Sequence, residues 1–260
     1  MRFQDQVVVI TGAARGIGFV TAEMAAREGA RVVVCDLDPT AVSAAVERLG
    51  GTAMGVAGDV SDLAQVQGNV DAVMKAHGRI DVLVNNAAIT SYHAPEKLSE
   101  ATFRRELEVN LAGPFFWAQT VANAWMIPQR KGAIVNLGSG AALAAMPRSA
   151  AYVAAKHGVV GLTKALAVDW GQYGIRVNCV CPGLTFTELS KFVASQNPDM
   201  IRQREQRIPL QRGAQPADIA HAILFLASAQ ADSISGETLS VDGGTLAMSS
   251  GYSAPRDGAG

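Results

Sequence analysis

Three residues in the middle of the chain could together carry out proton transfer. Tyr152 and Lys156 are four positions apart, so in a helix both side chains point to the same side. A neighbouring ammonium favours the phenolate and lowers the tyrosine pKa from about 10 towards the range in which general acid/base catalysis is efficient. Ser139, thirteen positions before the tyrosine, supplies a hydroxyl that can hold a substrate oxygen. By itself, this spacing is more typical of a surface helix with no catalytic role.

The helix that presents the tyrosine and the lysine is expected to begin just before them. Ser149 has a residue type that is preferred at a helix N-cap, where its hydroxyl accepts a hydrogen bond from the first turn. The segment from Gly140 to Ala151 connects Ser139 to the tyrosine. We expect this segment to line the substrate pocket.

A glycine-rich turn follows the first apolar segment, Val7 to Thr11, and precedes a helical pattern that runs to Ala30. Backbone without side chains can approach a pyrophosphate closely at a helix N-terminus, where free N–H groups favour an anion. A strand, a glycine turn and a helix in the first unit of the chain therefore predict a dinucleotide site. The turn residues expected to contact the cofactor are Gly12, Arg15, Gly16, Ile17 and Gly18.

The choice between NAD and NADP depends on Asp36, which closes the second apolar segment eighteen residues after Gly18. A carboxylate in this position can accept both hydrogen bonds of the adenosine ribose and repels a 2′-phosphate, which favours NAD. Arg15 indicates the opposite, because an arginine in the glycine turn could accompany a phosphate. Only Asp36 has the end-of-strand position that contacts the 2′ group directly, so we expect NAD, with NADP as the less favoured cofactor.

Strand-length and helix-length segments alternate along the whole chain. After Val7 to Thr11, strands are predicted at Arg31 to Asp36, Thr52 to Ala57, Asp81 to Asn85, Ala133 to Leu137, Arg176 to Val180 and Thr238 to Val241. Continuous apolar strands of this kind are buried on both faces of a parallel sheet. The pattern predicts an α/β protein with a single-domain Rossmann fold over residues 1–260: a doubly wound, seven-stranded parallel sheet with helices on both faces.

Two regions depart from this alternation. Residues from about 184 to 210 are polar and too numerous for an ordinary connection, and a loop of this size is often an active-site lid. Residues 245–260 are rich in serine and glycine and are expected to form a C-terminal tail that frays or packs on a neighbouring subunit.

The composition excludes several classes of protein. With 49% apolar and 17% charged residues the chain is expected to be soluble and globular, and a net charge of -1 without a basic cluster argues against a nucleic-acid binder. No apolar run approaches the ~20 residues of a membrane helix, and the N-terminus does not resemble a signal peptide, so a cytoplasmic protein is expected. Cys35, Cys179 and Cys181 have neither disulfide nor zinc spacing, so they are interpreted as small buried side chains and no metal is expected.

Taken together, these residues resemble the short-chain dehydrogenase/reductase family over nearly the whole chain. The shared motifs, in the family's order and spacing, are Thr11 to Gly18, Asn85 to Ala87, Asn110, Ser139, Tyr152 with Lys156, and Pro182-Gly183. The resemblance implies hydride transfer between a nicotinamide and a carbonyl or alcohol carbon, with Tyr152 exchanging the proton. It implies that Ser139 positions the substrate oxygen, that Lys156 holds the nicotinamide ribose and lowers the tyrosine pKa, and that Asn110 supports a proton relay through water.

The remaining cofactor contacts follow the third, fourth and sixth predicted strands. Asp59 could accept a bond from the adenine amino group or could be a helix N-cap, and Asn86 could contact the ligand or tie neighbouring strands together. By resemblance, Thr187 contacts the nicotinamide amide, and Ala88 stands where the family usually has glycine. The other positions in this group are Val60, Pro182, Gly183, Leu184 and Thr185.

Pro114 is four residues after Asn110 in a segment patterned as a helix. A proline cannot donate a backbone hydrogen bond to the Asn110 carbonyl, which is then free to bind water. We therefore predict a kinked helix at Asn110 with a bound water facing Lys156. Alternatively, Gly113 and Pro114 simply bend the helix around the core.

Two polar side chains are candidates for substrate contact. Arg148, in the segment before Tyr152, could hold a carboxylate, a sulfonate or several hydroxyls, and His93 is a second candidate. For each of them a solvated loop position is the alternative, and Ala141 is expected to line the pocket. The lid arginines are balanced by Glu205 and are interpreted as a solvated helix face: Arg202, Arg204 and Arg207.

The leading hypothesis is an NAD-dependent oxidation of a secondary alcohol, on a sugar, a polyol or another hydroxylated small molecule. One alternative is reduction of a 3-oxoacyl thioester, which would more naturally use NADP. A second alternative, from a different class, is a catalytically silent NAD-binding sensor. By resemblance a homotetramer is expected through the Tyr152 helix, where Gly158 and Gly161 would permit close contact, although packing inside one subunit would explain these glycines as well.

Overall fold

Seven parallel strands form the centre of the molecule. The computed structural model describes residues 1–50, 53–187 and 198–249. The strands are β1 Val7–Thr11, β2 Arg31–Asp36, β3 Met54–Ala57, β4 Val82–Asn85, β5 Gly132–Leu137, β6 Ile175–Pro182 and β7 Thr238–Val241. They form one sheet in the order β3-β2-β1-β4-β5-β6-β7, with neighbouring strands parallel. This order confirms the predicted doubly wound sheet, because the chain starts near the centre and extends to both edges.

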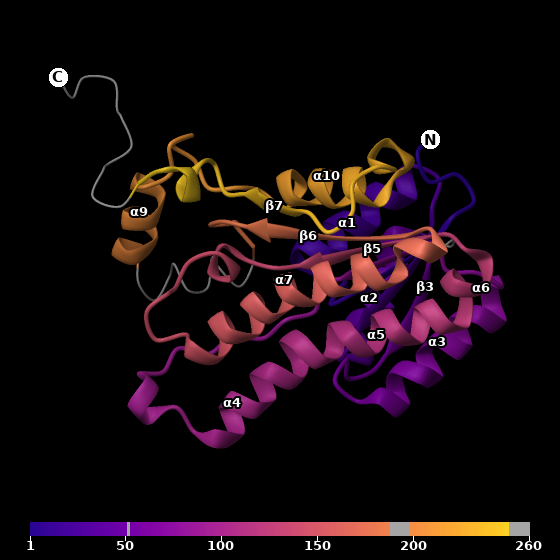
Figure 1. Cartoon of the computed structure of the whole chain (residues 1–260), viewed down its shortest axis with the longest axis horizontal. Helices are drawn as coiled ribbons and strands as arrows, with labels where there is room; N and C mark the ends of the chain where they lie inside the picture. Colours follow the sequence, from indigo (N-terminus) through magenta and orange to yellow (C-terminus); the bar gives the residue numbers. More distant parts are fainter. Residues whose placement is uncertain (51–52, 188–197, 250–260) are drawn as a thin grey trace.

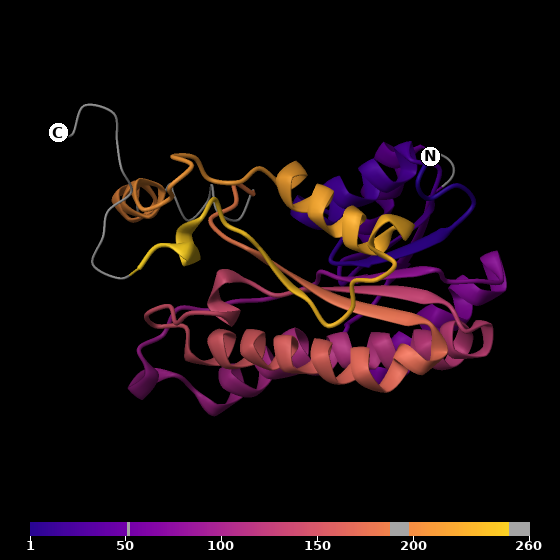
Figure 2. The same ribbon diagram turned by 45° about the horizontal axis from the view of Figure 1, so that its top comes forward.

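Helices cover both faces of the sheet (Figures 1 and 2). One layer contains α1 Gly16–Arg27, α2 Pro39–Leu49 and α10 Pro216–Ala227, and the other contains α3 Leu63–His77, α5 Gly113–Val121 and α7 Ala150–Trp170. In β1, Val8 and Ile10 pack against the first layer, whereas Val7 and Val9 pack against the second. Burial on both faces explains the continuous apolar strand sequences. Among the described helices, none combines the length and apolar character that crossing a bilayer requires.

The helical segment between β4 and β5 is interrupted twice, shortly before a proline each time. It comprises α4 Glu100–Leu107, a π-helical turn at Glu108–Ala112, α5, a second π-helical turn at Ala122–Met126 and α6 Ile127–Gln129. Pro114 and Pro128 cannot donate to the carbonyls four residues earlier, and in an α-helix their rings would clash with those carbonyls. The wider π turns avoid both problems. The predicted interruption at Asn110 is therefore confirmed, and the bound water stays a prediction.

A chain of buried amides connects the two central strands to the helices above them. Asn85 and Asn136 are register partners on β4 and β5. The Asn85 side-chain N–H group donates to the Asn136 Oδ1 atom at 2.9 Å and to the Pro114 carbonyl at 3.1 Å. The Asn136 amide in turn donates to the Thr163 hydroxyl on α7 at 2.9 Å. These bonds connect α5 and α7 to the sheet.

The predicted lid contains one described helix, α9 Pro198–Gln206. Ile201 and Ile208 are buried against Leu184, with Phe186 packed beside them, so α9 rests on the start of the lid segment. Residues 188–197 of the predicted lid and residues 250–260 of the predicted tail lie outside the described residues. Within the described part of the tail, Thr245–Ala247 form a short 3-10 helix.

Two cysteine thiols pack beneath the segment that leads to Ser139. Cys179 and Cys181 are fully buried on one face of β6, with their Sγ atoms 3.8 Å apart, as predicted for small core side chains. A Cβ atom at Gly138 would be 2.5 Å from the Cys181 Sγ atom and 2.9 Å from that of Cys179. The absence of a side chain at Gly138 thus allows β5 to continue into Ser139 close above β6.

We expect Gly138→Ala to lower the free energy of unfolding by about 1–3 kcal/mol, because the added methyl group overlaps two buried sulfurs. Gly140→Ala is the matched control on the other side of Ser139, since a Cβ atom there would make only an ordinary contact, 3.7 Å from the Pro182 carbonyl oxygen. Urea unfolding of both variants measures the difference. Equal stability of the two variants would contradict tight packing at the thiols.

Candidate active site

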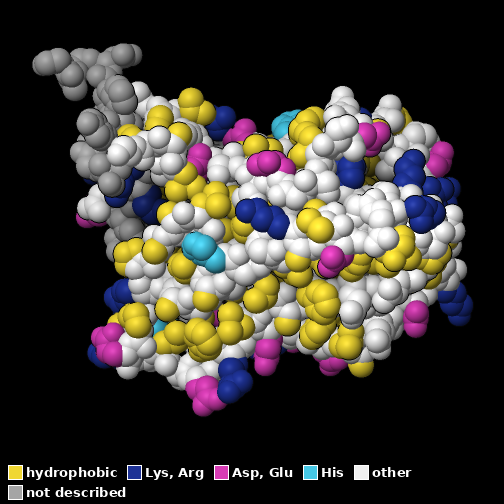
Figure 3. Space-filling model, viewed as in Figure 1, with side chains coloured by type: hydrophobic (Ala, Val, Ile, Leu, Met, Phe, Trp, Pro, Cys, Tyr) yellow, Lys and Arg dark blue, Asp and Glu magenta, His cyan; other side chains and the backbone are white. Residues whose placement is uncertain are grey.

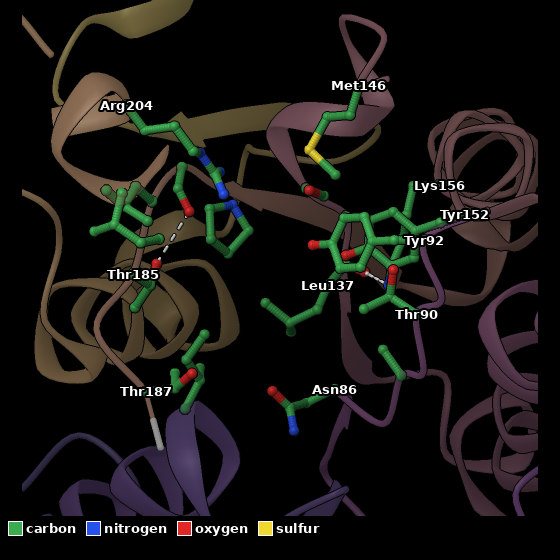
Figure 4. Close-up of a pocket in the computed structure, with 18 residues that line it drawn as sticks. Asn86, Thr90, Tyr92, Leu137, Met146, Tyr152, Lys156, Thr185, Thr187 and Arg204 are labelled. Carbon is green, nitrogen blue, oxygen red and sulfur yellow. Dashed lines mark hydrogen bonds between the residues drawn. The ribbon is translucent and has the colours of Figure 1, made fainter. Parts of the chain in front are cut away.

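The residues predicted to do chemistry meet at the carboxyl ends of the central strands. A cavity of about 410 Å³ lies there, and the three residues Ser139, Tyr152 and Lys156 all line it (Figure 4). Ser139 follows β5 and the other two are on α7. This is the edge of a doubly wound sheet at which ligands bind. The structure therefore brings the serine, the tyrosine and the lysine together, as the sequence predicts.

Lys156 is held by the end of β5. Its side chain is 2% exposed, and its Nζ atom donates to the Leu137 carbonyl at 2.7 Å. The same atom lies 5.7 Å from the centre of the Tyr152 ring. The ammonium is thus beside the phenol ring but bonded to the backbone.

Burial determines the electrostatics of this pair. Desolvation lowers the pKa of Lys156 from its ordinary value of 10.5 to about 8. Burial also raises the pKa of Tyr152, and a hydrogen bond with Ser139 only partly offsets this. The expected lowering of the tyrosine pKa by Lys156 is therefore wrong for the protein alone. The physical reason is that loss of water around the phenol outweighs the favourable interactions of its phenolate.

Ser139 and Ser149, which lie near the two ends of the segment that leads to Tyr152, make different contacts. Ser139 has an extended backbone and begins a short 3-10 helix, Gly140–Ala142, with its Oγ atom accepting a hydrogen bond from the Ala141 N–H group at 3.1 Å. Ser149 occupies the N-cap position of α7, as predicted, but its side chain makes no capping bond. Its hydroxyl instead donates to the Pro147 carbonyl at 3.3 Å. Only the position of this cap, and not its expected hydrogen bond, is confirmed.

Asn110 holds the loop that follows β4. Its side chain is fully buried, donates to the Ile89 carbonyl at 2.8 Å and accepts from the Ile89 N–H group at 3.0 Å. Each end of the amide therefore makes one bond to the loop, and the backbone carbonyl of Asn110, which Pro114 leaves without its usual donor, is available to a relay water. The proton relay through Asn110 stays a prediction.

A buried carboxylate on α4 also contacts the loop that follows β4. Glu106 is 2% exposed and is the buried residue of α4, and its Oε1 atom accepts a hydrogen bond from the Ser91 hydroxyl. The residues on either side of this serine, Thr90 and Tyr92, line the cavity. Glu106 therefore positions a wall of the pocket from a place that no sequence motif marked.

The glycine turn at the start of α1 has the predicted close packing. Gly12 and Gly16 have positive φ angles, and a Cβ atom at Gly12 would be 2.7 Å from the Ala87 Cα atom. A Cβ atom at Gly18 would be 2.5 Å from the Gly12 carbonyl oxygen. The Asn86 amide donates to the carbonyls of Thr11 and Gly12, each at 2.9 Å, and so ties the end of β4 to the end of β1. A contact between Asn86 and the cofactor stays a prediction.

A second cavity, of about 260 Å³, continues from this turn to the end of β2 and is lined by Gly12, Arg15, Asp36, Asp59 and Val60, among others. Asp36 accepts bonds from the N–H groups of Ala14 at 3.1 Å and Leu37 at 2.8 Å. Each of its oxygens still has acceptor capacity. The Arg15 side chain is exposed. A carboxylate facing this cavity fits the ribose of a dinucleotide.

Asp59 is engaged by neighbouring side chains. It accepts hydrogen bonds from the Ser61 hydroxyl at 2.7 Å and from the Arg105 guanidinium at 2.6 Å. Although burial raises the pKa of Asp59, these bonds hold it below its ordinary value. The N-cap interpretation is wrong, because Asp62 caps α3 by accepting from two first-turn N–H groups. An adenine contact through Asp59 stays a prediction.

The positions after β6 that are expected to contact the cofactor line the same cavity as Tyr152, together with three positions from the glycine turn and the loop after β4: Pro182, Gly183, Leu184, Thr185 and Thr187, with Ile17, Asn86 and Ala88. A Cβ atom at Gly16 would be 3.9 Å from the Thr187 side chain, so the glycine turn adjoins this group. From Asp36 to Tyr152 the residues thus provide a carboxylate, a backbone cradle without side chains and a phenol hydroxyl. This arrangement fits a dinucleotide.

The two polar candidates for substrate contact take the solvated loop positions that the sequence offered as the alternative. Arg148 and His93 are exposed, and neither lines a cavity described above. Arg148 has a φ angle of 61°, and its carbonyl accepts a hydrogen bond from the His93 N–H group at 2.9 Å. The two loops are joined through their backbones, with these side chains turned to solvent. Ala141 is buried and lines an adjoining cavity.

Other residues take the places expected for these contacts. Tyr92, next to His93, lines the cavity, as do Met146 and Ile201. Arg204 lines it as well, and Figure 4 shows its guanidinium extending from α9 towards the middle of the pocket. The signals were present in the sequence, since Met146 belongs to the expected segment and Arg204 to the expected lid. What the sequence did not give was the direction of each side chain.

We expect Lys156 to contribute an increase of about 1 kcal/mol to the unfolding free energy between pH 7 and pH 9. The folded pKa of about 8 is below the ordinary 10.5, so this amine binds more protons in the unfolded chain and its contribution to stability increases with pH. Lys156→Met should remove this increment, whereas Lys164→Met, at an exposed position of the same helix, should retain it. Urea unfolding at pH 7, 8 and 9 measures the slopes, and an unchanged slope in Lys156→Met would contradict the assignment.

Comparison with known proteins identifies the family. The sequence matches the family model described as enoyl-(acyl carrier protein) reductase over residues 12–245. It is 41% identical over 247 residues to D-threitol dehydrogenase of Mycolicibacterium smegmatis, covering 94% of each chain. It is 38% identical over 250 residues to a 3-oxoacyl-[acyl-carrier-protein] reductase of Thermotoga maritima, covering 95% of this chain and 100% of the relative.

A solved structure agrees with these matches. The crystal structure of levodione reductase is similar with a TM-score of 0.90 at 33% identity, covering 95% of this chain and 100% of that one. The similarity thus extends over nearly the whole fold. The chain belongs to the short-chain dehydrogenase/reductase family of oxidoreductases.

Proposed function

We propose that the protein oxidises a secondary alcohol to a ketone with NAD, on a sugar, a polyol or another hydroxylated small molecule. The observation that supports this most is the meeting of Ser139, Tyr152 and Lys156 at one cavity with Pro182 and Thr187 from the nicotinamide side. A Rossmann fold alone would support only nucleotide binding. The three side chains around one cavity support a reaction.

The substrate hydroxyl is proposed to lie between Ser139 and Tyr152. The Ser139 hydroxyl donates a hydrogen bond to the substrate oxygen, and the Tyr152 phenolate takes the hydroxyl proton as the ketone forms. The hydrogen on the carbon leaves as hydride, for which NAD, when bound, supplies the acceptor. In the reverse direction the Tyr152 phenol donates its proton to the ketone oxygen. Lys156, beside the phenol ring, holds the ribose and stabilises the phenolate while it is charged.

The raised pKa of Tyr152 has a consequence for direction. Oxidation needs the phenolate and reduction needs the phenol. Because burial keeps Tyr152 protonated to higher pH, oxidation should become faster as pH rises, and ketone reduction should become slower.

Asp36 supports NAD as the cofactor. Its carboxylate lies at the end of β2 and lines the cavity that continues from the glycine turn. The charge would repel a 2′-phosphate, and the exposed Arg15 has no described partner that directs it to this position. We propose that NAD binds more tightly than NADP.

Thioester reduction and NAD sensing without catalysis are the two alternative functions. The similarity to a 3-oxoacyl-[acyl-carrier-protein] reductase favours reduction of a thioester as the second candidate, and the similarity to D-threitol dehydrogenase favours a polyol. A catalytically silent NAD-binding sensor would not need Ser139, Tyr152 and Lys156 at one cavity. Their assembly favours an enzyme.

We further propose a cytoplasmic homotetramer. Figure 3 shows hydrophobic side chains on the face that carries α4, α5 and α7. On this face Val168 is 80% exposed and Phe103 is 38% exposed, and a Cβ atom at Gly161 would meet open space, so α7 has room for a second copy. Gly158 has an explanation inside the subunit, because a Cβ atom there would be 2.8 Å from the Leu111 side chain.

We expect Tyr152→Phe to reduce alcohol oxidation by roughly 10²–10⁴-fold, because the variant cannot take the substrate proton. Tyr173→Phe, which removes a hydroxyl far from the cavity, should retain the wild-type rate. The measurement is NADH formation at pH 7 to 10 during a screen of secondary alcohols, polyols, sugars and sugar acids. Turnover retained in Tyr152→Phe would overturn the proton-transfer assignment. A wild type that binds NAD but oxidises none of these compounds would favour the sensor.

We expect wild type to bind NAD more tightly than NADP, and Asp36→Asn to weaken NAD binding by roughly tenfold through loss of a charged acceptor. Asp38→Asn is the matched control, because Asp38 is exposed two residues later and caps α2, a role that asparagine also fills. Calorimetric titration of each protein with both cofactors checks this. Tighter binding of NADP by wild type would refute the cofactor preference.

A further inference from the structure

We propose that the substrate carries an anionic group and that Arg204 of α9 and Arg207, which follows this helix, bind it in an extension of the cavity around Tyr152. This inference rests on the proposed function, since the anion would belong to the alcohol that Tyr152 deprotonates. It assigns the two arginines, interpreted from the sequence as a solvated helix face, to substrate specificity.

The substrate cavity is longer than the space around Tyr152. A further cavity of about 380 Å³, the extension, shares part of its lining with the cavity around Tyr152: Ser139, Met146, Pro182, Gly183, Leu184 and Arg204. It extends to α9 and to the segment that follows β7. A molecule whose hydroxyl lies at Ser139 can therefore continue towards α9.

Two guanidinium groups line this extension. Arg204 lines both the cavity around Tyr152 and the extension, and Arg207 lines the extension. Arg204 is in the last turn of α9, and Arg207 is the residue just after this helix, where its N–H group donates to the Arg204 carbonyl at 3.2 Å. The buried Ile201 and Ile208 anchor this part of the chain. The arginines are thus presented to the cavity by a segment that packs on the rest of the molecule.

The charges around the extension are not balanced. Within residues 1–50, 53–187 and 198–249, neither Arg204 nor Arg207 forms an ion pair. Of the described residues that line the two cavities, Asp242 alone is a carboxylate. Its oxygens accept bonds from the N–H groups of Gly244 at 2.9 Å and Leu246 at 2.8 Å. With Lys156 at the other end, the cavity favours an anion over a neutral or cationic molecule.

The lining selects the kind of anion. Apart from the arginines and Asp242, the far part of the extension is formed by small or apolar side chains, including Ala144, Ala145, Leu246 and Met248. Such walls suit a short carbon chain, and a guanidinium matches the two oxygens of a carboxylate or another oxyanion. The substrate class is therefore a small secondary alcohol that ends in an oxyanion, such as a hydroxy acid or a sugar acid.

The test compares alcohols that differ in charge. The two pairs are D-gluconate with D-sorbitol, and 3-hydroxybutyrate with 2-butanol. For the anionic member of an accepted pair, Arg204→Ala should raise KM by roughly 10–100-fold, because it removes a charge-assisted hydrogen bond, and it should change KM for the neutral member by less than about threefold. Arg148→Ala is the matched control, since its exposed arginine lies outside both cavities, and it should change neither value.

A binding measurement separates this inference from the reaction. Calorimetric titration of the anionic compounds into Tyr152→Phe, with and without Arg204→Ala, should show tighter binding when the arginine is present. If wild type oxidises neutral alcohols as well as anionic ones, or if Arg204→Ala weakens both members equally, the anion site is refuted and the proposed dehydrogenase stands. If wild type oxidises no secondary alcohol at all, the proposed function fails and this inference fails with it.

Discussion

The hydrogen bond from the buried Lys156 amine to the Leu137 carbonyl sets the geometry of the active site. It joins α7 to the end of β5 at 2.7 Å. Tyr152 is one helical turn earlier on α7, and Ser139 is two residues after Leu137, so this contact fixes the tyrosine and the serine relative to each other. The cost is the desolvation of an amine, whose pKa falls to about 8. An apolar residue in place of Lys156 would avoid this desolvation and give a more stable protein, but the amine beside Tyr152 would be lost.

The surroundings of this bond hold both of its ends in place. On the helix side, the amide chain from Asn85 through Asn136 reaches Thr163, two turns beyond the lysine. On the strand side, the thiols of Cys179 and Cys181 occupy the space beneath Gly138. Ser139, Tyr152 and Lys156 are therefore held in place by polar and apolar contacts inside the protein.

The fold and the meeting of Ser139, Tyr152 and Lys156 at one cavity could be predicted because their signals are local. Burial on both faces requires continuous apolar strands, and the glycine turn has to leave space for backbone. Side-chain direction in loops has no such signal. Arg148 turns to solvent because its backbone adopts a φ angle of 61° and bonds His93. Neither periodicity nor residue type indicates that choice, and the same holds for Arg204, whose helix is positioned by distant apolar contacts.

The predictions of a helix cap at Asp59 and of a lowered pKa for Tyr152 were wrong for a related reason. Residue type made both Asp59 and Asp62 possible caps, and only the start of α3 at Leu63 selects between them. The effect of Lys156 on the tyrosine was expected from charge alone. In the folded chain, loss of water opposes that effect and is larger for Tyr152.

The π turn at Glu108–Ala112 also allows α4 and α5, which form one continuous helical segment, to contact different parts of the protein. A π turn contains one residue more than an α turn, and one residue corresponds to a rotation of about 100° around the axis. The faces of α4 and α5 are consequently out of phase, so that Glu106 points to the pocket wall while Trp117 points to the core. This phase shift uncouples the two halves. Pocket-facing positions on α4 can diverge in sequence without repacking the core beneath α5.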